Sequence, residues 1–147
     1  MTRQEFAKQA YEAAAESSRE SGVPPMVTVA QAALESNWGQ SGLSREANNY
    51  FGIKAHKGHE QIVMRTGECE KGAQVVVSAA FAKYQSMLDC FRCRDGILAK
   101  GVVYAGARAK AHDEEQFIAE MAKHWATDPN YAKKLKAMLS EVKGLVQ

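Results

Sequence analysis

The sequence predicts an α+β fold that is mostly α-helical, with helices arranged around one small β hairpin. Two observations predict it. Apolar residues recur at helical spacing over most of the chain, and β-branched residues concentrate in only one pair of neighbouring segments. The length of 147 residues, of which 46% are hydrophobic, suits one core. We therefore expect a single domain over residues 1–147, with a β lobe at about 54–84.

Two helices are expected in the first third of the chain. Thr2 and Glu5 form a capping box, and the helical pattern that follows ends at Gly22. Pro24 and Pro25 suit the start of a second helix, which should end near residue 39. Its apolar stripe comprises Met26, Val27, Ala30, Ala33 and Leu34, whereas its other side carries Thr28, Gln31 and Glu35.

The remaining elements follow from spacing and turn residues. A short helical turn is expected at 43–47. The segments QIVMRTGE (61–68) and AQVVVSAAFAKY (73–84) predict two strands joined by the turn CEKG. Helical periodicity predicts further helices over 86–100, 113–125 and 130–146, the last with Asp128 as N-cap and Pro129 as first helical residue.

Composition and charge exclude several classes of protein. A formal charge of +2 is too small for a typical nucleic-acid binder. The N-terminus alternates charge with Ala and no long apolar run follows, so we expect neither a signal peptide nor a membrane partner. Cys69, Cys90 and Cys93 are an odd set, which favours free thiols in a reducing compartment. We expect a monomer.

Glu35 is the only ionisable side chain between Val23 and Ser44, although charged residues make up 24% of the chain. Its helical face carries Thr28 and Gln31 where a solvated face would carry Lys and Glu, so we expect another element to cover that face. A carboxyl in a partly desolvated groove has a raised pKa and can keep the proton that a glycosidase general acid needs. The alternative is a surface residue near a helix end.

The stretch AQAALESNWGQSGLSREANNYFGIK (30–54) closely resembles the signature of the bacterial glucosaminidase family, glycoside hydrolase family 73, which includes autolysins. The ordered residues that carry this resemblance are Glu35, Ser36, Trp38, Gly39, Asn48, Asn49, Phe51 and Gly52. FAKYQS (81–86) and WATDPNYAKKL (125–135) are similar to two further elements of the family, with Trp125 where a Tyr is usual. The resemblance covers roughly residues 2–145.

The resemblance implies a lysozyme-like fold in which a helical lobe and a β-hairpin lobe flank a cleft. It implies an endo-β-N-acetylglucosaminidase that hydrolyses the β-1,4 bond between N-acetylglucosamine and N-acetylmuramic acid in peptidoglycan glycan strands. No metal or organic cofactor is expected, and Glu35 matches the general acid.

Glu68 matches the family's second carboxylate, but strand alternation puts Glu70 on the same face and leaves it as an alternative. If Glu68 activates water, the two carboxyls should lie about 6.5–9.5 Å apart and the product should be inverted. A wider gap would favour attack by the substrate's own 2-acetamido group, with retention of configuration.

Aromatic rings stack on sugar faces, and amides recognise hydroxyl and acetamido groups. The candidate substrate-binding residues are therefore Trp38, Asn49, Tyr50, Tyr84, Trp125 and Tyr131. We favour Asn49, Tyr84 and Trp125, whereas packing is the stronger expectation for Trp38.

Two motifs of metal-binding type are assigned no role. CFRC (90–93) has redox-motif spacing but lies in an expected helix without a preceding parallel strand, and only Cys69 could join it as a zinc ligand. HKGH (56–59) could hold a metal with Glu60, yet loop histidines of this kind are usually surface residues. We therefore predict no metal site.

Two other functions stay open. One is a muramidase or lytic transglycosylase of the same fold, and the other is a non-catalytic cell-wall-binding domain. The expected place of action is the cell wall, in the periplasm or outside the cell. A phage endolysin, made in the host cytoplasm and released by another protein, fits a lone catalytic domain without an evident leader.

Overall fold

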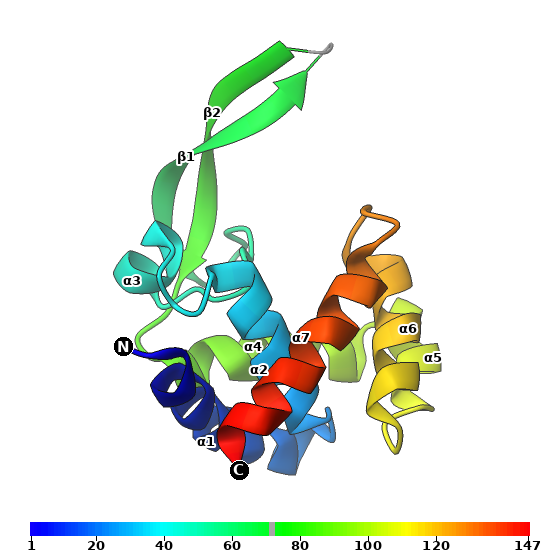
Figure 1. The fold of residues 1–147 in the computed structure, drawn as a ribbon. Helices are drawn as coiled ribbons and strands as arrows, with labels where there is room; N and C mark the ends of the chain where they lie inside the picture. Colours follow the sequence, from blue (N-terminus) through cyan, green and yellow to red (C-terminus); the bar gives the residue numbers. More distant parts are fainter. Residues whose placement is uncertain (71–72) are drawn as a thin grey trace.

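The computed structural model describes the backbone of residues 1–70 and 73–147, and the side chains of these residues except 66–70, 73–75 and 77. Its helices are α1 (Arg3–Ser21), α2 (Pro25–Ser36), α3 (Gly42–Ala47), α4 (Met87–Lys100), the 3-10 helix η1 (Val102–Tyr104), α5 (Ala105–Arg108), α6 (Glu114–Trp125) and α7 (Tyr131–Val146). Its strands are β1 (Glu60–Glu70) and β2 (Ala73–Lys83). Figure 1 shows the helices gathered in one body from which the hairpin extends as an arm. The predicted α+β class, mostly α, is confirmed.

The first two helices begin where local signals predict. Thr2 accepts a hydrogen bond from the Glu5 backbone amide, and the Glu5 side chain accepts one from the Thr2 amide, each at 3.0 Å. Gly22 ends α1 with φ 74°, a left-handed conformation that glycine adopts without steric cost. α2 begins at Pro25 but ends at Ser36, earlier than predicted, because the next residue is already left-handed.

α2 lies at the centre of the helical body, packed against α1 and α7. Val27, Ala30 and Ala33 are buried as predicted. Thr28 and Gln31, on the opposite side, have no exposed surface either. The expectation that another element covers this polar face is confirmed, since residues of α4 and α7 bond to it.

The segments after the hairpin match the prediction in part. α4 and α6 each begin one residue later than predicted, because Ser86 and Asp113 are their N-caps. Between these helices the structure has η1 and α5, which were not predicted. Arg108 of α5 donates to the carbonyls of Leu98 and Gly101 at 2.8 and 2.7 Å, and so satisfies acceptors that the end of α4 leaves free.

α7 begins at Tyr131, so the assignment of Asp128 as N-cap and Pro129 as first helical residue is wrong. Asp128 instead accepts hydrogen bonds from the backbone amide of Asn130 at 2.8 Å and from Lys134 at 2.7 Å. A short Asp side chain readily bonds the backbone two residues on, and this local turn precedes the helix.

The hairpin is anchored at its base. β1 and β2 pair antiparallel along their whole length. Near the helical body Phe81 and Ala82 are buried, whereas Val63 and Val76 on the arm are 64% and 63% exposed. Contacts at the base therefore determine where the arm points. Among the described residues, no helix has the length and apolarity needed to cross a membrane.

A buried ion pair joins three helices. Arg94 has no exposed surface and lies 2.9 Å from the carboxylate of its neighbour Asp95. Arg94 also donates to Thr28 Oγ1 at 2.6 Å and to Gln31 Oε1 at 2.7 and 2.9 Å. Asp95 accepts a hydrogen bond from Ser17 of α1 at 2.6 Å. These bonds compensate both charges for lost hydration and connect α4 to α1 and α2.

Arg94→Ala should lower the free energy of unfolding by about 3–5 kcal/mol, because it leaves Asp95 as a buried charge without its partner. The control is Arg92→Ala, which removes an exposed arginine of the same helix and should cost less than about 1 kcal/mol. Equilibrium unfolding in urea measures both. Equal losses in the two variants would show that the buried pair does not hold these helices together.

Candidate active site

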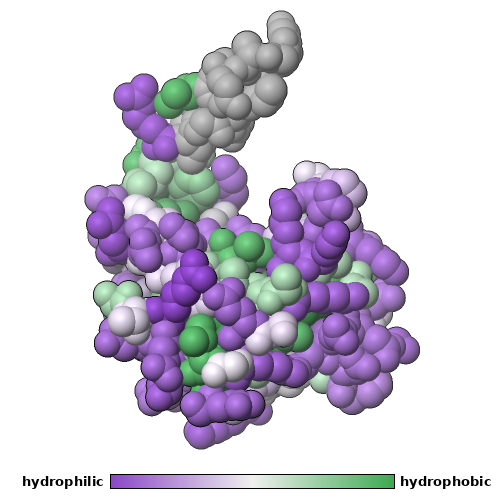
Figure 2. Space-filling model, viewed as in Figure 1, coloured by the Kyte–Doolittle hydropathy of each residue, from purple (hydrophilic) through white to green (hydrophobic). Residues whose placement is uncertain are grey.

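Figure 2 shows a hollow in the surface between the side from which the hairpin rises and the α6–α7 connection. The C-terminal end of α2 points toward this hollow in Figure 1. At that end Glu35 meets Tyr131, the first residue of α7, whose hydroxyl donates to Glu35 Oε1 at 2.6 Å. Two helices thus bring a carboxyl and a phenol together where α2 ends and α7 begins.

Glu35 is exposed. The expectation that a dry groove encloses it is therefore wrong for the free protein. α7, which covers Gln31, begins at Tyr131, and Tyr131 lies beside Glu35. α7 therefore does not extend past the last turn of α2. The inner side of Glu35 contacts protein and its outer side faces solvent.

Hydrogen bonds connect Arg94 to Glu35 through Gln31 and Tyr131, and each residue donates to the next. A guanidinium can only donate, so Gln31 turns its carbonyl oxygen toward Arg94. The amide nitrogen of Gln31 then faces Tyr131 and donates to its hydroxyl oxygen at 2.9 Å. Because that oxygen already accepts, Tyr131 directs its single proton to Glu35.

Tyr131 is buried and forms its hydrogen bonds with other residues of the protein. It is 6% exposed. Burial, together with the charge of Glu35 and the hydrogen bond to it, raises the pKa of the Tyr131 hydroxyl far above the usual range. The phenol therefore stays protonated and donates. Its hydroxyl is used by Gln31 and Glu35, so Tyr131 positions the carboxyl instead of offering a free ring face to a sugar.

The turn after α2 is unusual. Asn37, Trp38 and Gly39 have consecutive positive φ angles of 50°, 58° and 78°. The left-handed conformation costs Trp38 roughly 1–2 kcal/mol. Its ring packs edge-on against Phe6, with centroids 6.1 Å apart, and lies 4.8 Å below the guanidinium of Arg3. Trp38 is thus a packing residue that fixes the end of α2.

Asn49 is buried, and every hydrogen-bonding position of its amide faces the protein. Its nitrogen donates to the carbonyls of Ile53 and Ala82, both at 2.9 Å. Its oxygen accepts from the backbone amides of Phe51 and Ile53 at 3.3 and 3.1 Å. This geometry argues against the expected contact with a sugar. Asn49 instead ties the loop after α3 to β2.

The other predicted aromatic residues lie in different places. Tyr84 is buried, and its hydroxyl donates to Cys93 Sγ at 3.1 Å. Tyr50 and Trp125 are half-buried. Trp125 is the last residue of α6, beside the α6–α7 connection that borders the hollow. Of the predicted substrate-binding set, Tyr131 adjoins Glu35, and contact of Trp125 with a sugar stays a prediction.

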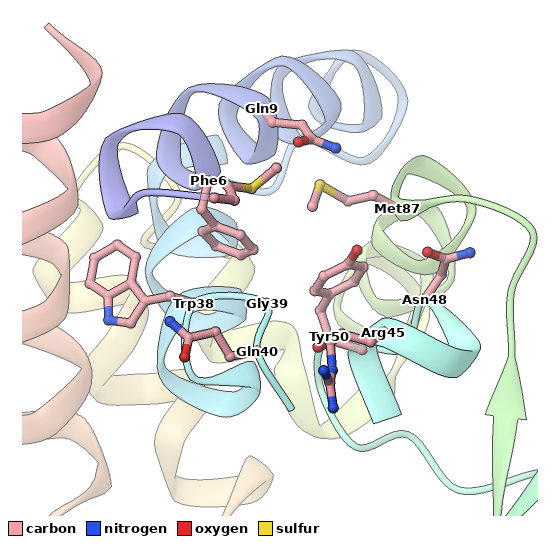
Figure 3. A pocket seen from close by; sticks show the side chains of 11 residues that line it. Phe6, Gln9, Trp38, Gly39, Gln40, Arg45, Asn48, Tyr50 and Met87 are labelled. Carbon is pink, nitrogen blue, oxygen red and sulfur yellow. The ribbon is translucent and has the colours of Figure 1, made fainter. Parts of the chain in front are cut away.

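Tyr50 belongs to a separate pocket of about 460 Å³ between α1, the turn after α2, α3 and the start of α4. Figure 3 shows Tyr50 and Met87 on one side of this pocket and Phe6 and Trp38 on the other. Its described lining residues include neither Glu35 nor any other carboxylate. The pocket therefore lacks the acid that glycoside hydrolysis requires.

The second carboxylate stays a prediction. Glu68 and Glu70 lie in β1, and the backbone of Glu68 pairs with Val75. The side chains of both glutamates are outside the described residues. The choice between them rests on the sequence motif alone.

Arg94 is the residue that the sequence analysis missed. It lies in α4 at helical spacing from Cys90, Phe91 and Leu98, which are all buried. An arginine within an otherwise apolar stripe was the available signal. Its partners on α2 could not be read from spacing.

Residues of HKGH and CFRC, the two motifs that were assigned no role, lie close together in the structure. The ligand atoms of His56, His59 and Cys93 all lie within 4.8 Å of one another. This grouping differs from both combinations considered from the sequence. Burial raises the pKa of the Cys90 thiol to about 12, so Cys90 does not supply the easily formed thiolate of a redox motif.

Comparison with known proteins identifies the family. The glucosaminidase model, described as mannosyl-glycoprotein endo-beta-N-acetylglucosaminidase, matches residues 11–144. The peptidoglycan hydrolase FlgJ of Salmonella typhimurium is 37% identical over 134 residues, which cover 87% of this chain and 42% of FlgJ. The exo-glucosaminidase LytG of Bacillus subtilis is 35% identical over 125 residues, which cover 81% of this chain and 44% of LytG. The chain thus spans less than half the length of these relatives.

A solved structure shows the same fold. The catalytic domain of the autolysin Auto from Listeria monocytogenes matches with a TM-score of 0.87 and 32% identity, covering 100% of this chain and 88% of that domain. The expected lysozyme-like arrangement of a helical lobe and a hairpin lobe is confirmed. Together, the family match and the sequence identities show that this chain belongs to the glucosaminidase family, glycoside hydrolase family 73.

Proposed function

We propose that this chain hydrolyses peptidoglycan glycan strands as an endo-β-N-acetylglucosaminidase, cleaving the β-1,4 bond between N-acetylglucosamine and N-acetylmuramic acid. One observation carries the proposal: Glu35, at the C-terminal end of α2, is held from the inside by the Tyr131 hydroxyl and is exposed on its outer side. The family and the names of the relatives FlgJ and LytG support the substrate class.

Glu35 serves as the general acid. Because Tyr131 donates to Oε1, the proton that Glu35 transfers resides on Oε2. This proton passes to the glycosidic oxygen as its bond to the anomeric carbon breaks. Charge then develops on Glu35, and the hydrogen bond from Tyr131 strengthens with it. The buried chain from Arg94 thus prepares a donor for the carboxylate before the reaction begins.

The bound glycan completes the environment of Glu35. In the free protein the carboxyl is exposed. A sugar chain lying in the hollow displaces water from its outer side. Trp125, at the border of the hollow, offers a half-buried ring on which a sugar can stack.

Glu68 is proposed as the second carboxylate, assisting the attack of water on the anomeric carbon. Its support is the position of Glu68 in the motif and in β1, on the hairpin that rises beside the hollow. Glu70 is the alternative on the same strand.

The proposed place of action is the cell wall, in the periplasm or outside the cell, where peptidoglycan is found. Membership of the glucosaminidase family supports this location. Synthesis as a phage endolysin and action as a monomer stay predictions.

Glu35→Gln should reduce lytic activity by about 10²–10⁴-fold, because the amide cannot donate the required proton. The matched control is Glu46→Gln, which alters an exposed carboxyl of α3 and should retain full activity. Turbidity loss of purified peptidoglycan measures both. A pure wall-binding domain would show no lysis before or after the substitution.

Mass spectrometry of the wild-type digest tests the bond that is cut. Reducing-end N-acetylglucosamine on fragments of varied length supports the endo-glucosaminidase. Reducing or anhydro muramic ends would contradict it and support the muramidase or transglycosylase.

Tyr131→Phe should lower kcat roughly tenfold, equivalent to about 1.4 kcal/mol, with little change in KM, because the donor acts mainly on the charged carboxylate. Tyr11→Phe, which alters an exposed tyrosine of α1, is the control and should change neither constant. Steady-state kinetics on a soluble glycan fragment measures both. An unchanged kcat in a folded Tyr131→Phe variant would contradict the proposed positioning role.

Product configuration tests the role of Glu68. If Glu68 directs water to the anomeric carbon, NMR of fresh digests should show the inverted α-anomer as the first product. A retained β-anomer would contradict direct water attack and indicate participation of the 2-acetamido group. Glu68→Gln and Glu70→Gln, assayed side by side, show which glutamate the reaction needs.

A further inference from the structure

His56, His59 and Cys93 form a cluster at the junction of the hairpin lobe and α4. The two histidines lie in the loop before β1, and Cys93 lies in the second turn of α4. Their ligand atoms are within 4.8 Å of one another, although Cys93 follows His59 by 34 residues in the chain. The fold itself brings these side chains together.

The cluster has unused bonding capacity. His59 Nδ1 is buried and has no hydrogen-bond partner among the described residues. An unsatisfied buried polar atom costs about 1–3 kcal/mol, so its presence points to a missing ligand. The rings of His56 and His59 approach to 3.8 Å between centroids. His56 Nδ1 lies 3.1 Å from the carbonyl of Lys54, which leaves its Nε2 free.

We propose that His56, His59 and Cys93 bind one zinc ion. Imidazole and thiolate are the ligands that zinc prefers, whereas calcium and magnesium require oxygen. Zinc ligand bonds of about 2.0–2.3 Å place the donor atoms of a tetrahedral site roughly 3.3–3.6 Å apart. Side-chain rotations that move these atoms by about 1 Å therefore complete the site.

The surroundings fit a zinc ion with three protein ligands. The hydroxyl of Tyr84 lies 3.1 Å from Cys93 Sγ and can donate to a zinc-bound thiolate, a typical partner for a metal ligand. A pocket of about 310 Å³ is lined by His56, His59 and their neighbours, so water has access to the fourth position. Cys90 is fully buried and bonds the amide of Tyr50, so it takes no part.

The ion stabilises the attachment of the hairpin. The loop at 54–59 leads directly into β1, and Lys54 forms a bridge to Phe81 of β2. A zinc ion held by this loop and by α4 fastens the base of the hairpin to the helical lobe. Because the folded protein alone presents all three ligands in place, zinc raises its stability over the unfolded chain.

The test is metal binding by the tag-free, reduced protein after treatment with a chelator. Calorimetry should show one zinc ion per chain, and zinc at 100-fold above its Kd should raise Tm by about 5 °C or more. Cobalt should give the thiolate-to-cobalt absorption of a tetrahedral site, and Cys93→Ser should abolish it. Cys69→Ser should leave that absorption intact.

His56→Ala is the decisive variant, because His56 is exposed and its loss leaves the fold intact. It should weaken zinc binding by more than roughly 100-fold. Even the mutation of a residue that only hydrogen-bonds a metal ligand typically lowers metal affinity by about 10–100-fold. His112→Ala, which removes an exposed histidine outside the cluster, should bind as the wild type does. Less than one zinc per wild-type chain, or equal affinity in His56→Ala and wild type, would overturn the site. These measurements need no peptidoglycan, so their outcome is independent of the proposed hydrolysis.

Discussion

The buried guanidinium of Arg94 is the constraint on which the arrangement of the site depends. It has no exposed surface and offers only donors, so each neighbour must present an acceptor. Asp95 provides a carboxylate, and Gln31 provides its carbonyl oxygen. Once the amide of Gln31 is oriented, the direction of the Tyr131 hydroxyl follows, and so does the bond to Glu35. The buried charge of Arg94 thereby determines that the hydroxyl proton of Tyr131 points toward Glu35.

This dependence gives a reason for keeping an ion pair in the core. A buried pair often contributes little net stability compared with well-packed apolar side chains of the same volume. With an apolar residue in place of Arg94, however, the amide of Gln31 would have no partner that distinguishes its oxygen from its nitrogen. Tyr131 could then donate to Gln31 instead of Glu35. The pair therefore orients the carboxyl of Glu35 in addition to joining the helices.

The sequence predicted what is determined locally. The capping box at Thr2 and the end of α1 at Gly22 depend on residues within one turn, and both are confirmed. The start of α7 was misplaced because Asp128 has two local donors that compete with a capping role. The partners of Arg94 lie 63 to 66 residues away, beyond the reach of periodicity. Asn49 shows a further limit: a residue in a family signature can be required for a loop as well as for a ligand.

The position of the second carboxylate depends on a different physical property, the stiffness of the hairpin. Its base is fixed by buried bonds, from Asn49 to the carbonyl of Ala82 and from the Tyr84 amide to the carbonyl of Ala47. On the arm, the side chains of Val63 and Val76 are mostly exposed. Breaking the base bonds would leave buried polar groups unpaired, whereas a two-stranded ribbon twists easily. If Glu68 acts with Glu35, its approach must therefore come from twisting of the strands beyond the base. On the proposed mechanism, the core fixes the acid in advance, and movement of the hairpin brings its partner into position.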